Sequence, residues 1–181
     1  MGFGAKWRNW ILSCLKSTSI SILVNGSPTN EFKLGRGVRQ SNPLSPFLFI
    51  LVAEGLNILT KAEVRSGLFS GVEVGNDRVP ISILQYANDT IFFGSWNESS
   101  ILNLTKLLKC VELTSGLKVN YHKSNIFGVG VNKLKVDAMA NKNGCKVGSF
   151  PFIYLGLSIG AKMNKMASWE VVAKFDKRLS D

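Results

Sequence analysis

The chain has 181 residues, of which 45% are hydrophobic and 19% charged, and this suits one ordinary globular domain and argues against global disorder. It contains no apolar run long enough to cross a bilayer and no secretory signal. Three widely separated cysteines and one histidine argue against a disulfide framework and a zinc site, so we expect an intracellular chain, with no signal that assigns it to the nucleus or the cytoplasm.

The formal charge of +10 is unevenly distributed along the chain. Residues 1–40 carry a net charge of +5, residues 41–90 a net charge of −2, and residues 91–181 a net charge of +7. Basic flanks around a mildly acidic centre suit a polyanionic partner such as nucleic acid. They are equally compatible with a basic domain whose lysines simply face water.

A helix and a hairpin are predicted in the first forty residues. Apolar side chains recur at helical spacing and predict an amphipathic helix over residues 5–17. The alternating, β-branched segment 19–24 then predicts a strand, the dipeptide Asn25-Gly26 a tight turn, and segment 31–38 the returning strand.

A long helix followed by β-structure is predicted in the middle of the chain. Ser45 is a natural N-cap for a helix that runs to about residue 64. Segment 66–80 is rich in Gly and Val, with a turn at residues 76–77. Two apolar runs on either side of residues 87–89 predict a buried β-hairpin with a polar tip.

Short helices and strands are predicted in the remainder of the chain. In chain order they are a helix at 101–111 closed by Gly116, strands at 117–121 and 125–131, a weak helix at 132–143, a strand and turn at 150–159, and a helix at 169–179. Helices mixed with antiparallel strands indicate an α+β fold.

Aromatic residues are expected mainly in the core, where they pack rather than stack on bases. Phe47 and Phe49 lie in a predicted apolar helix, and Phe92 and Phe93 lie in a predicted apolar strand. The single histidine, His122, is expected at a surface turn.

The turn Tyr86-Ala87-Asn88-Asp89 is the most specific chemical feature of the sequence. A carboxylate at a tight turn between two apolar strands is held rigidly toward solvent, which suits a hard cation such as Mg²⁺. Two-metal phosphoryl transfer needs several carboxylates around ions about 4 Å apart, and Asp89 alone cannot provide them. The alternative is ordinary turn chemistry, because Asn and Asp both favour turns.

The dipeptide Arg39-Gln40, which leads into a Pro-rich loop and a helix, is the second candidate site. These two side chains, together with backbone amides at the start of the helix, are suited to hold a phosphate or a template base. The alternative is a capped helix with a polar lead-in.

In addition to these features, motifs along nearly the whole chain resemble those of a known protein family. They are MGFG (1–4) with Trp7 and Trp10-Ile11, SILVNGSP (21–28), GVRQ (37–40), PLSPFLF (43–49), AEGL (53–56), LQYA (84–87) with Asp89-Thr90, GLKVN (116–120) with Lys123-Ser124, and YLGL (154–157) with Ile159-Gly160. In this order and spacing they resemble the reverse transcriptase domain of plant LINE-type, non-LTR retrotransposons.

The resemblance implies a partial polymerase palm, which is an antiparallel sheet packed on helices, with the fingers and thumb largely missing. The palm core would cover about residues 19–131, and the start of the primer-grip and thumb-side region would cover about residues 145–181. The implied activity is RNA-directed DNA synthesis on an RNA template and a DNA primer, with Mg²⁺ or Mn²⁺ as cofactor. A membrane is not expected as a partner.

The resemblance also implies roles for particular residues. Arg39 and Gln40 would contact the template and the incoming nucleotide, and Tyr86 would contact nucleic acid. Asp89 would bind metal, and Lys123 would lie near the triphosphate as a proton donor to the leaving pyrophosphate. The grip on the 3′ end of the primer would be formed by Tyr154, Leu155 and Gly156.

Four positions depart from the pattern of the family. Asn88 stands where the first aspartate of the metal turn is expected, Ser41-Asn42 replaces a Gly-Asp pair, and Ser158 replaces a proline. Each change is reachable by one G-to-A or C-to-T transition, which we interpret as decay of a silenced element. The remaining metal aspartate of the family lies upstream, and no candidate precedes Met1. We therefore expect weak metal binding and no polymerisation by this chain alone.

Two other interpretations stay open. The first is a non-catalytic, basic nucleic-acid-binding module, whose affinity would fall log-linearly with salt. The second is an unselected transposon relic without a function.

Overall fold

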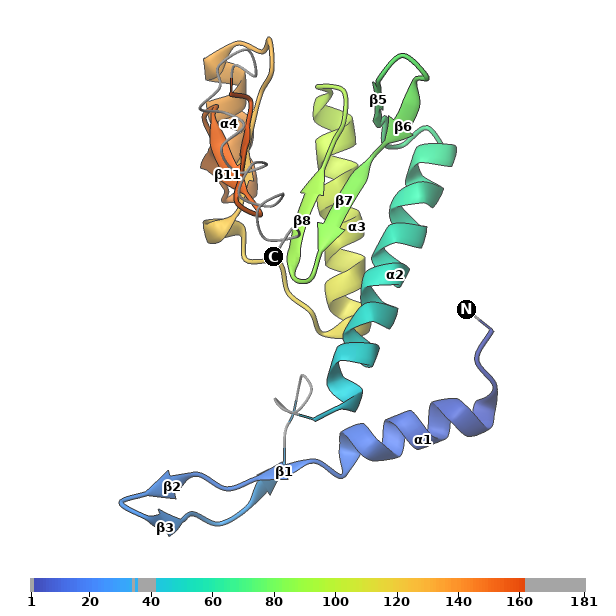
Figure 1. The fold of residues 1–181 in the computed structure, drawn as a ribbon, viewed down its shortest axis with the longest axis vertical. Coiled ribbons are helices and arrows are strands. Elements are labelled where there is room, and N and C mark those ends of the chain that lie inside the picture. The colour runs from blue at the N-terminus through green and yellow to red at the C-terminus, as the bar shows by residue number, and fades with distance from the viewer. Residues whose placement is uncertain (1, 34, 36–41, 162–181) are drawn as a thin grey trace, which may run out of the picture. The chain divides into compact units, whose positions relative to one another are not determined.

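The structure is a computed structural model that describes residues 2–33, 35 and 42–161. The chain divides into two compact units, Met1–Val119 and Asn120–Asp181, which we describe separately (Figure 1). Both contain helices and short strands, so the predicted mixed α+β class is confirmed. The predicted helix at 169–179 lies outside the described residues, and the predicted domain limits stay a prediction.

The first unit begins with the predicted amphipathic helix, α1 (Ala5–Lys16). None of its residues is buried, and Trp10 is 60% exposed. Phe3 stacks on Trp7 with ring centroids 4.1 Å apart, and the Lys6 ammonium lies 5.1 Å from the Trp10 ring. The apolar face of α1 is therefore covered only by its own local contacts among the described residues.

The predicted N-terminal hairpin is present as two short antiparallel pairs. They are formed by β1 (Ser19–Ile20) with β4 (Phe32–Lys33) and by β2 (Leu23–Val24) with β3 (Ser27–Pro28). Asn25 and Gly26 have φ angles of 49° and 82°, as the predicted two-residue turn requires. The predicted return strand extends past β4 into residues 34 and 36–38, which lie outside the described part.

The long helix α2 (Leu44–Arg65) starts two residues earlier than the predicted N-cap Ser45 implies, and its N-cap is Pro43, which makes no side-chain cap hydrogen bond. Asn42, the residue before Pro43, accepts a hydrogen bond of 2.9 Å at Oδ1 from the Leu44 N–H. The expectation that Phe47 belongs to the core is wrong, because this side chain is 65% exposed, whereas Phe49 is half-buried.

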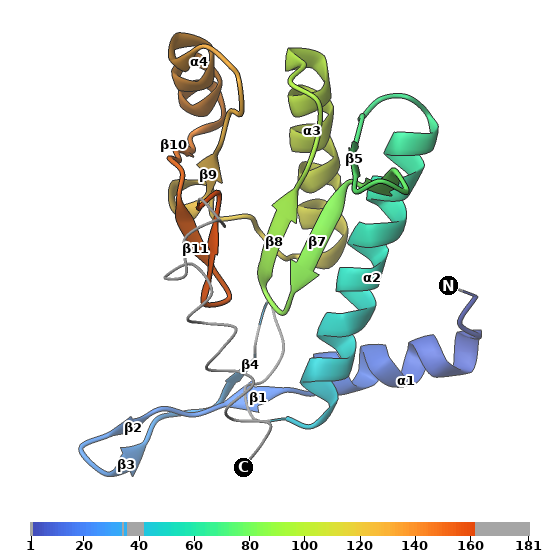
Figure 2. The ribbon, with the colours of Figure 1, turned by 45° about the horizontal axis from the view of Figure 1, so that its top comes forward.

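The remainder of the first unit packs two hairpins and a helix against α2. Its elements are β5 (Val72–Val74), β6 (Val79–Ile81), β7 (Ile83–Tyr86), β8 (Asp89–Phe92) and α3 (Glu98–Ser115). Both α3 and β7 contact α2, as Figures 1 and 2 show. The small core includes Phe69, Leu107 and Val111, with Thr60 fully buried.

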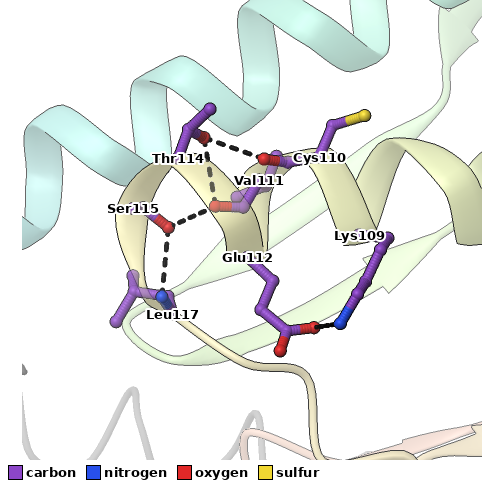
Figure 3. Close-up of polar contacts among 7 residues, drawn as sticks. All are labelled: Lys109, Cys110, Val111, Glu112, Thr114, Ser115 and Leu117. Carbon is purple, nitrogen blue, oxygen red and sulfur yellow. Dashed lines mark hydrogen bonds and ion pairs between the residues drawn. The ribbon is translucent and has the colours of Figure 1, made fainter.

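The C-terminal end of α3 is closed as predicted by Gly116, which has a φ angle of 75°. Thr114 Oγ1 donates to the carbonyl oxygens of Cys110 at 2.9 Å and Val111 at 3.1 Å (Figure 3). Ser115 Oγ donates to the Val111 carbonyl oxygen at 2.6 Å. The hydroxyl groups of the last turn thus bond to their own helix rather than to a neighbouring element.

The second unit is built around a parallel strand pair joined by a helix. Its described elements are η1 (Tyr121–Lys123), β9 (Asn125–Ile126), α4 (Lys133–Asn143), β10 (Lys146–Val147), β11 (Phe152–Tyr154) and β12 (Leu157–Ile159). β9 and β10 pair in parallel, while β11 and β12 form an antiparallel hairpin. Phe127 stacks on Phe152 at 4.2 Å beside the buried Val136, Met139 and Ala140.

Two sequence predictions in this unit need correction. The predicted strand at 117–121 does not form, because Asn120 Oδ1 accepts from the Lys123 N–H at 3.2 Å and caps the short helix η1. The predicted strand at 125–131 shortens to the two residues of β9. The helix at 132–143 and the hairpin at 150–159 are confirmed as α4 and β11–β12.

The strands described here pair only in twos. They make five antiparallel pairs and one parallel pair, each with strands of two to four residues. A continuous antiparallel sheet is thus not formed within 2–33, 35 and 42–161, and the polymerase palm stays a proposal. In the same ranges, no helix is both long and apolar enough to cross a membrane.

Gly148 provides a test of packing in the second unit. A Cβ atom at this position would overlap the ring of Phe127, so Gly148→Ala should lower the free energy of unfolding by about 1–3 kcal/mol. The measurement is urea denaturation followed by circular dichroism. Gly35→Ala is the matched control, because a Cβ there meets nothing within 4 Å. An unchanged midpoint for Gly148→Ala would mean that the Phe127 ring is loosely packed.

Candidate functional site

The hairpin β7–β8 holds the central candidate residues. Tyr86 pairs with Asp89 across a turn that consists of Ala87 and Asn88. Ala87 has a φ angle of 48°, in the left-handed region that alanine rarely adopts. Asp89 is therefore the first residue of β8, at the base of a two-residue turn, and not part of a three-residue tip as predicted.

The two faces of this hairpin differ in exposure. Paired side chains share a face, and faces alternate along each strand, so Tyr86, Asp89 and Leu84 lie on one face and Gln85 and Thr90 on the other. Leu84 is 47% and Tyr86 62% exposed, and Asp89 is also exposed. Gln85 and Thr90 are half-buried. The expectation of a buried hairpin is wrong, because no residue of β7 or β8 is buried and one face is only half-buried. The Asp89 carboxylate is presented to solvent on the same face as the Tyr86 ring.

The described residues at this turn do not fit a two-metal centre. The Asp89 side chain has no hydrogen-bond or ion-pair partner in the described part of the chain, and its neighbour at the turn is the neutral amide of Asn88. Across the same ranges no group of three or more His, Cys, Asp or Glu side chains could hold a metal ion. One carboxylate and one amide can contact a single cation but cannot bridge two.

Lys123 lies in the second unit, at the end of η1, with its side chain exposed. Its backbone N–H is held by Asn120, and the adjacent His122 is exposed, as expected for a turn histidine. Asp89 belongs to the first unit and Lys123 to the second, so these two predicted site residues are described separately. The role of Lys123 near a triphosphate stays a prediction.

The turn predicted as a primer grip is a two-residue hairpin turn. Tyr154 pairs with Leu157, and Leu155 and Gly156 between them have φ angles of 52° and 82°. Leu155 is 46% exposed, while Tyr154 is half-buried. The turn therefore presents a leucine side chain to solvent in a backbone conformation that favours glycine. The other predicted contacts, Arg39 and Gln40, lie outside the described residues.

A cavity that the sequence did not indicate lies between α2 and the hairpin β5–β6. Its volume is about 310 Å³, and Lys61, Arg65 and Glu73 are among its lining residues. The four-residue spacing of Lys61 and Arg65 on α2 is the only sequence signal that could have suggested it. Arg78 lies 4.0 Å from Glu73 in an exposed ion pair. No residue of the Tyr86–Asp89 turn lines this cavity.

The cysteines form no disulfide bond among the described residues. Burial raises the pKa of the Cys145 thiol, so this group stays protonated at neutral pH. Cys14 and Cys110 are exposed.

Comparison with known proteins finds a distant similarity to retrotransposon proteins. It is 29% identical over 127 residues to the retrovirus-related Pol polyprotein from type-1 retrotransposable element R2 of Popillia japonica, covering 68% of this chain and 17% of that protein. It is 26% identical over 162 residues to the Pol polyprotein from type-2 retrotransposable element R2DM of Drosophila melanogaster, covering 90% of this chain and 14% of that protein. The chain is thus distantly similar to Pol proteins of non-LTR retrotransposons.

A further relative is covered over most of its length. The chain is 32% identical over 108 residues to the uncharacterized mitochondrial protein AtMg01250 of Arabidopsis thaliana, covering 60% of this chain and 88% of that protein. The chain belongs to the same family as this protein. No protein-family model matches the chain. The comparisons thus support a distant resemblance to Pol proteins of non-LTR retrotransposons. The assignment to a plant lineage of reverse transcriptases stays a prediction.

Ala87 tests whether the hairpin turn is strained. Ala87→Gly should raise the free energy of unfolding by about 0.5–1 kcal/mol, because glycine adopts a positive φ angle without a steric penalty. Thermal or urea unfolding measures the change. The control is Asn88→Gly, where no positive φ angle is relieved and stability should fall slightly. Equal effects of the two variants would show that Ala87 is unstrained.

Proposed function

We propose that the chain is a reverse transcriptase-type domain that contacts nucleic acid and does not polymerise on its own. The observation that carries this proposal is the β7–β8 turn, which presents Asp89 and Tyr86 together on an exposed face. The similarity to Pol proteins, which covers up to 90% of this chain, supports it. Because the chain spans less than a fifth of those proteins, their whole activity is not attributed to it.

Each site residue has a role under this proposal. Asp89 is the remaining carboxylate for Mg²⁺ or Mn²⁺, and Tyr86 lies against nucleic acid. Arg39 and Gln40 contact an RNA template or the incoming nucleotide, and Lys123 acts near the triphosphate. The 3′ end of a DNA primer contacts the turn of Tyr154, Leu155 and Gly156.

The chemistry of phosphoryl transfer supports the absence of polymerisation. This reaction depends on positioning and on metal electrostatics rather than on covalent help from the protein. The neutral amide of Asn88 cannot offset the charge of a dication as a carboxylate does. Loss of metal ligands costs several kcal/mol of transition-state stabilisation, and each 1.36 kcal/mol is about tenfold in rate.

A non-catalytic binding module is the second candidate, and a specific observation favours it. The described lysines of the second unit are exposed, and none of them belongs to an ion pair in the described part of the chain. Such a module would bind RNA without metal dependence, whereas a polymerase remnant would show some dependence on Mg²⁺ or Mn²⁺.

Primer extension tests the proposal directly. Purified chain with an annealed RNA template and DNA primer, nucleotides and Mg²⁺ or Mn²⁺ should give no extended product above a no-protein control. The reason is the single carboxylate at the β7–β8 turn. Time-dependent, template-directed extension that disappears in Asp89→Ala would overturn the proposed inactivity.

Cation binding tests the site independently of activity. Asn88→Asp should tighten Mn²⁺ binding about tenfold, because it places a second carboxylate beside Asp89. Electron paramagnetic resonance of free Mn²⁺ measures the affinity. Asn76→Asp is the matched control, since it creates the same pair of carboxylates with Asp77 in the β5–β6 turn. Equal tightening in both variants would show that the β7–β8 turn has no special cation geometry.

A further inference from the structure

Positive charge is concentrated in the second unit. Asn120–Asp181 contains ten basic and four acidic residues, a net charge of +6 in 62 residues. Met1–Val119 contains twelve basic and eight acidic residues, a net charge of +4 in 119 residues. The density of net charge is therefore about three times higher in the second unit.

The two units also differ in how their charges are paired. The ion pairs found among the described residues, Arg78–Glu73 and Lys109–Glu112, both lie in the first unit. In residues 120–161 the single acidic residue is Asp137, which is half-buried. The exposed lysines of that segment are thus not neutralised by carboxylates within it.

The packing of α4 distinguishes two of these lysines, Lys135 and Lys142. Val136, Met139 and Ala140 are buried and define the inner side of the helix. Lys135 and Lys142 are seven residues apart, so they lie on one side of α4, about 10 Å apart along its axis. Both side chains are exposed.

Lys146 is the next lysine along the chain, four residues beyond Lys142. Gly144 closes α4 with a φ angle of 68°, and Lys146 then begins β10. Its N–H donates to the Ser124 carbonyl oxygen at 2.9 Å, which fixes its backbone, while the side chain is exposed. We define Lys135, Lys142 and Lys146 as the α4 lysine surface. Lys133 is not included, because Asp137 lies one turn away on its side of the helix.

We propose that the α4 lysine surface is the place where this chain holds the phosphate backbone of single-stranded RNA. This inference rests on the proposed function and locates its binding step. Lysines spaced along a helix and the following strand match a linear polyanion, whose affinity comes from phosphate neutralisation. An anionic membrane is a poorer match, because α4 buries Val136, Met139 and Ala140 and exposes only one large apolar side chain, Leu134, which is too little for an apolar face toward a bilayer.

The test measures binding of the full chain to a fluorescently labelled single-stranded RNA at several KCl concentrations. For the unsubstituted chain, the logarithm of the affinity should fall linearly with the logarithm of the salt concentration. The triple variant Lys135→Gln, Lys142→Gln, Lys146→Gln should reduce the steepness of this slope by about 2, since each phosphate contact on a single strand contributes about 0.7. It should also weaken binding at least tenfold at low salt.

Three further variants keep the result interpretable. Replacing the same three lysines by arginine should preserve the slope, and circular dichroism of both triple variants should match that of the unsubstituted chain. Lys61→Gln with Arg65→Gln removes two charges from the first unit and should leave the slope nearly unchanged. Lys133→Gln should also have little effect.

The outcomes separate this inference from the proposed function. If the unsubstituted chain does not bind RNA, the proposed contact with nucleic acid fails as well. If the chain binds RNA and the glutamine triple variant retains the full slope while the Lys61 and Arg65 variant loses it, only the α4 lysine surface is wrong. Binding to vesicles with anionic lipid that is tighter than RNA binding, and is lost in the triple variant, would assign the surface to a membrane and overturn the inference.

Discussion

The alternation of side chains along β7 and β8 decides what the central hairpin presents to solvent. Strand side chains point alternately to two faces, so placing Gln85 and Thr90 on the half-buried face leaves Tyr86 and Asp89 on the exposed one. A register shift of one residue would exchange the faces and bury a carboxylate that has no partner, which is costly. The two-residue turn prevents this shift, and the unfavourable backbone of Ala87 is the consequence of keeping it.

Local sequence rules predicted this fold where a residue type leaves few alternatives. Asn25-Gly26 and Gly116 were assigned correctly, because left-handed backbone at a tight turn or a helix end strongly favours these residues. The rules failed where neighbouring residues compete for one role. Pro43 and not Ser45 is the N-cap of α2, while the Asn42 side chain accepts from the Leu44 N–H. Asn120 caps η1 where a strand was predicted, since its side-chain oxygen reaches a backbone N–H three residues ahead.

Non-local features could not be predicted from such rules. The parallel pairing of Asn125 with Lys146 joins residues on either side of α4, and neither two-residue strand carries a pattern of its own. The exposure of Phe47 depends on which neighbours reach α2, which helical periodicity does not show. The same limit applies to the candidate site. The turn that presents Asp89 is local and was predicted in outline, whereas any relation between Asp89 and Lys123 joins two units.

Catalysis and binding make different demands on such a domain. Two-metal chemistry needs several carboxylates around two closely spaced ions, so one change from aspartate to asparagine at position 88 affects the whole centre. Phosphate binding sums many weak charge contacts and tolerates the loss of any one. In this chain the two properties are also separated along the sequence, because Asn88 lies in the first unit, whereas the density of net positive charge is about three times higher in the second. A substitution that removes polymerisation therefore leaves the basis for polyanion binding intact, and the two proposed properties can be lost independently.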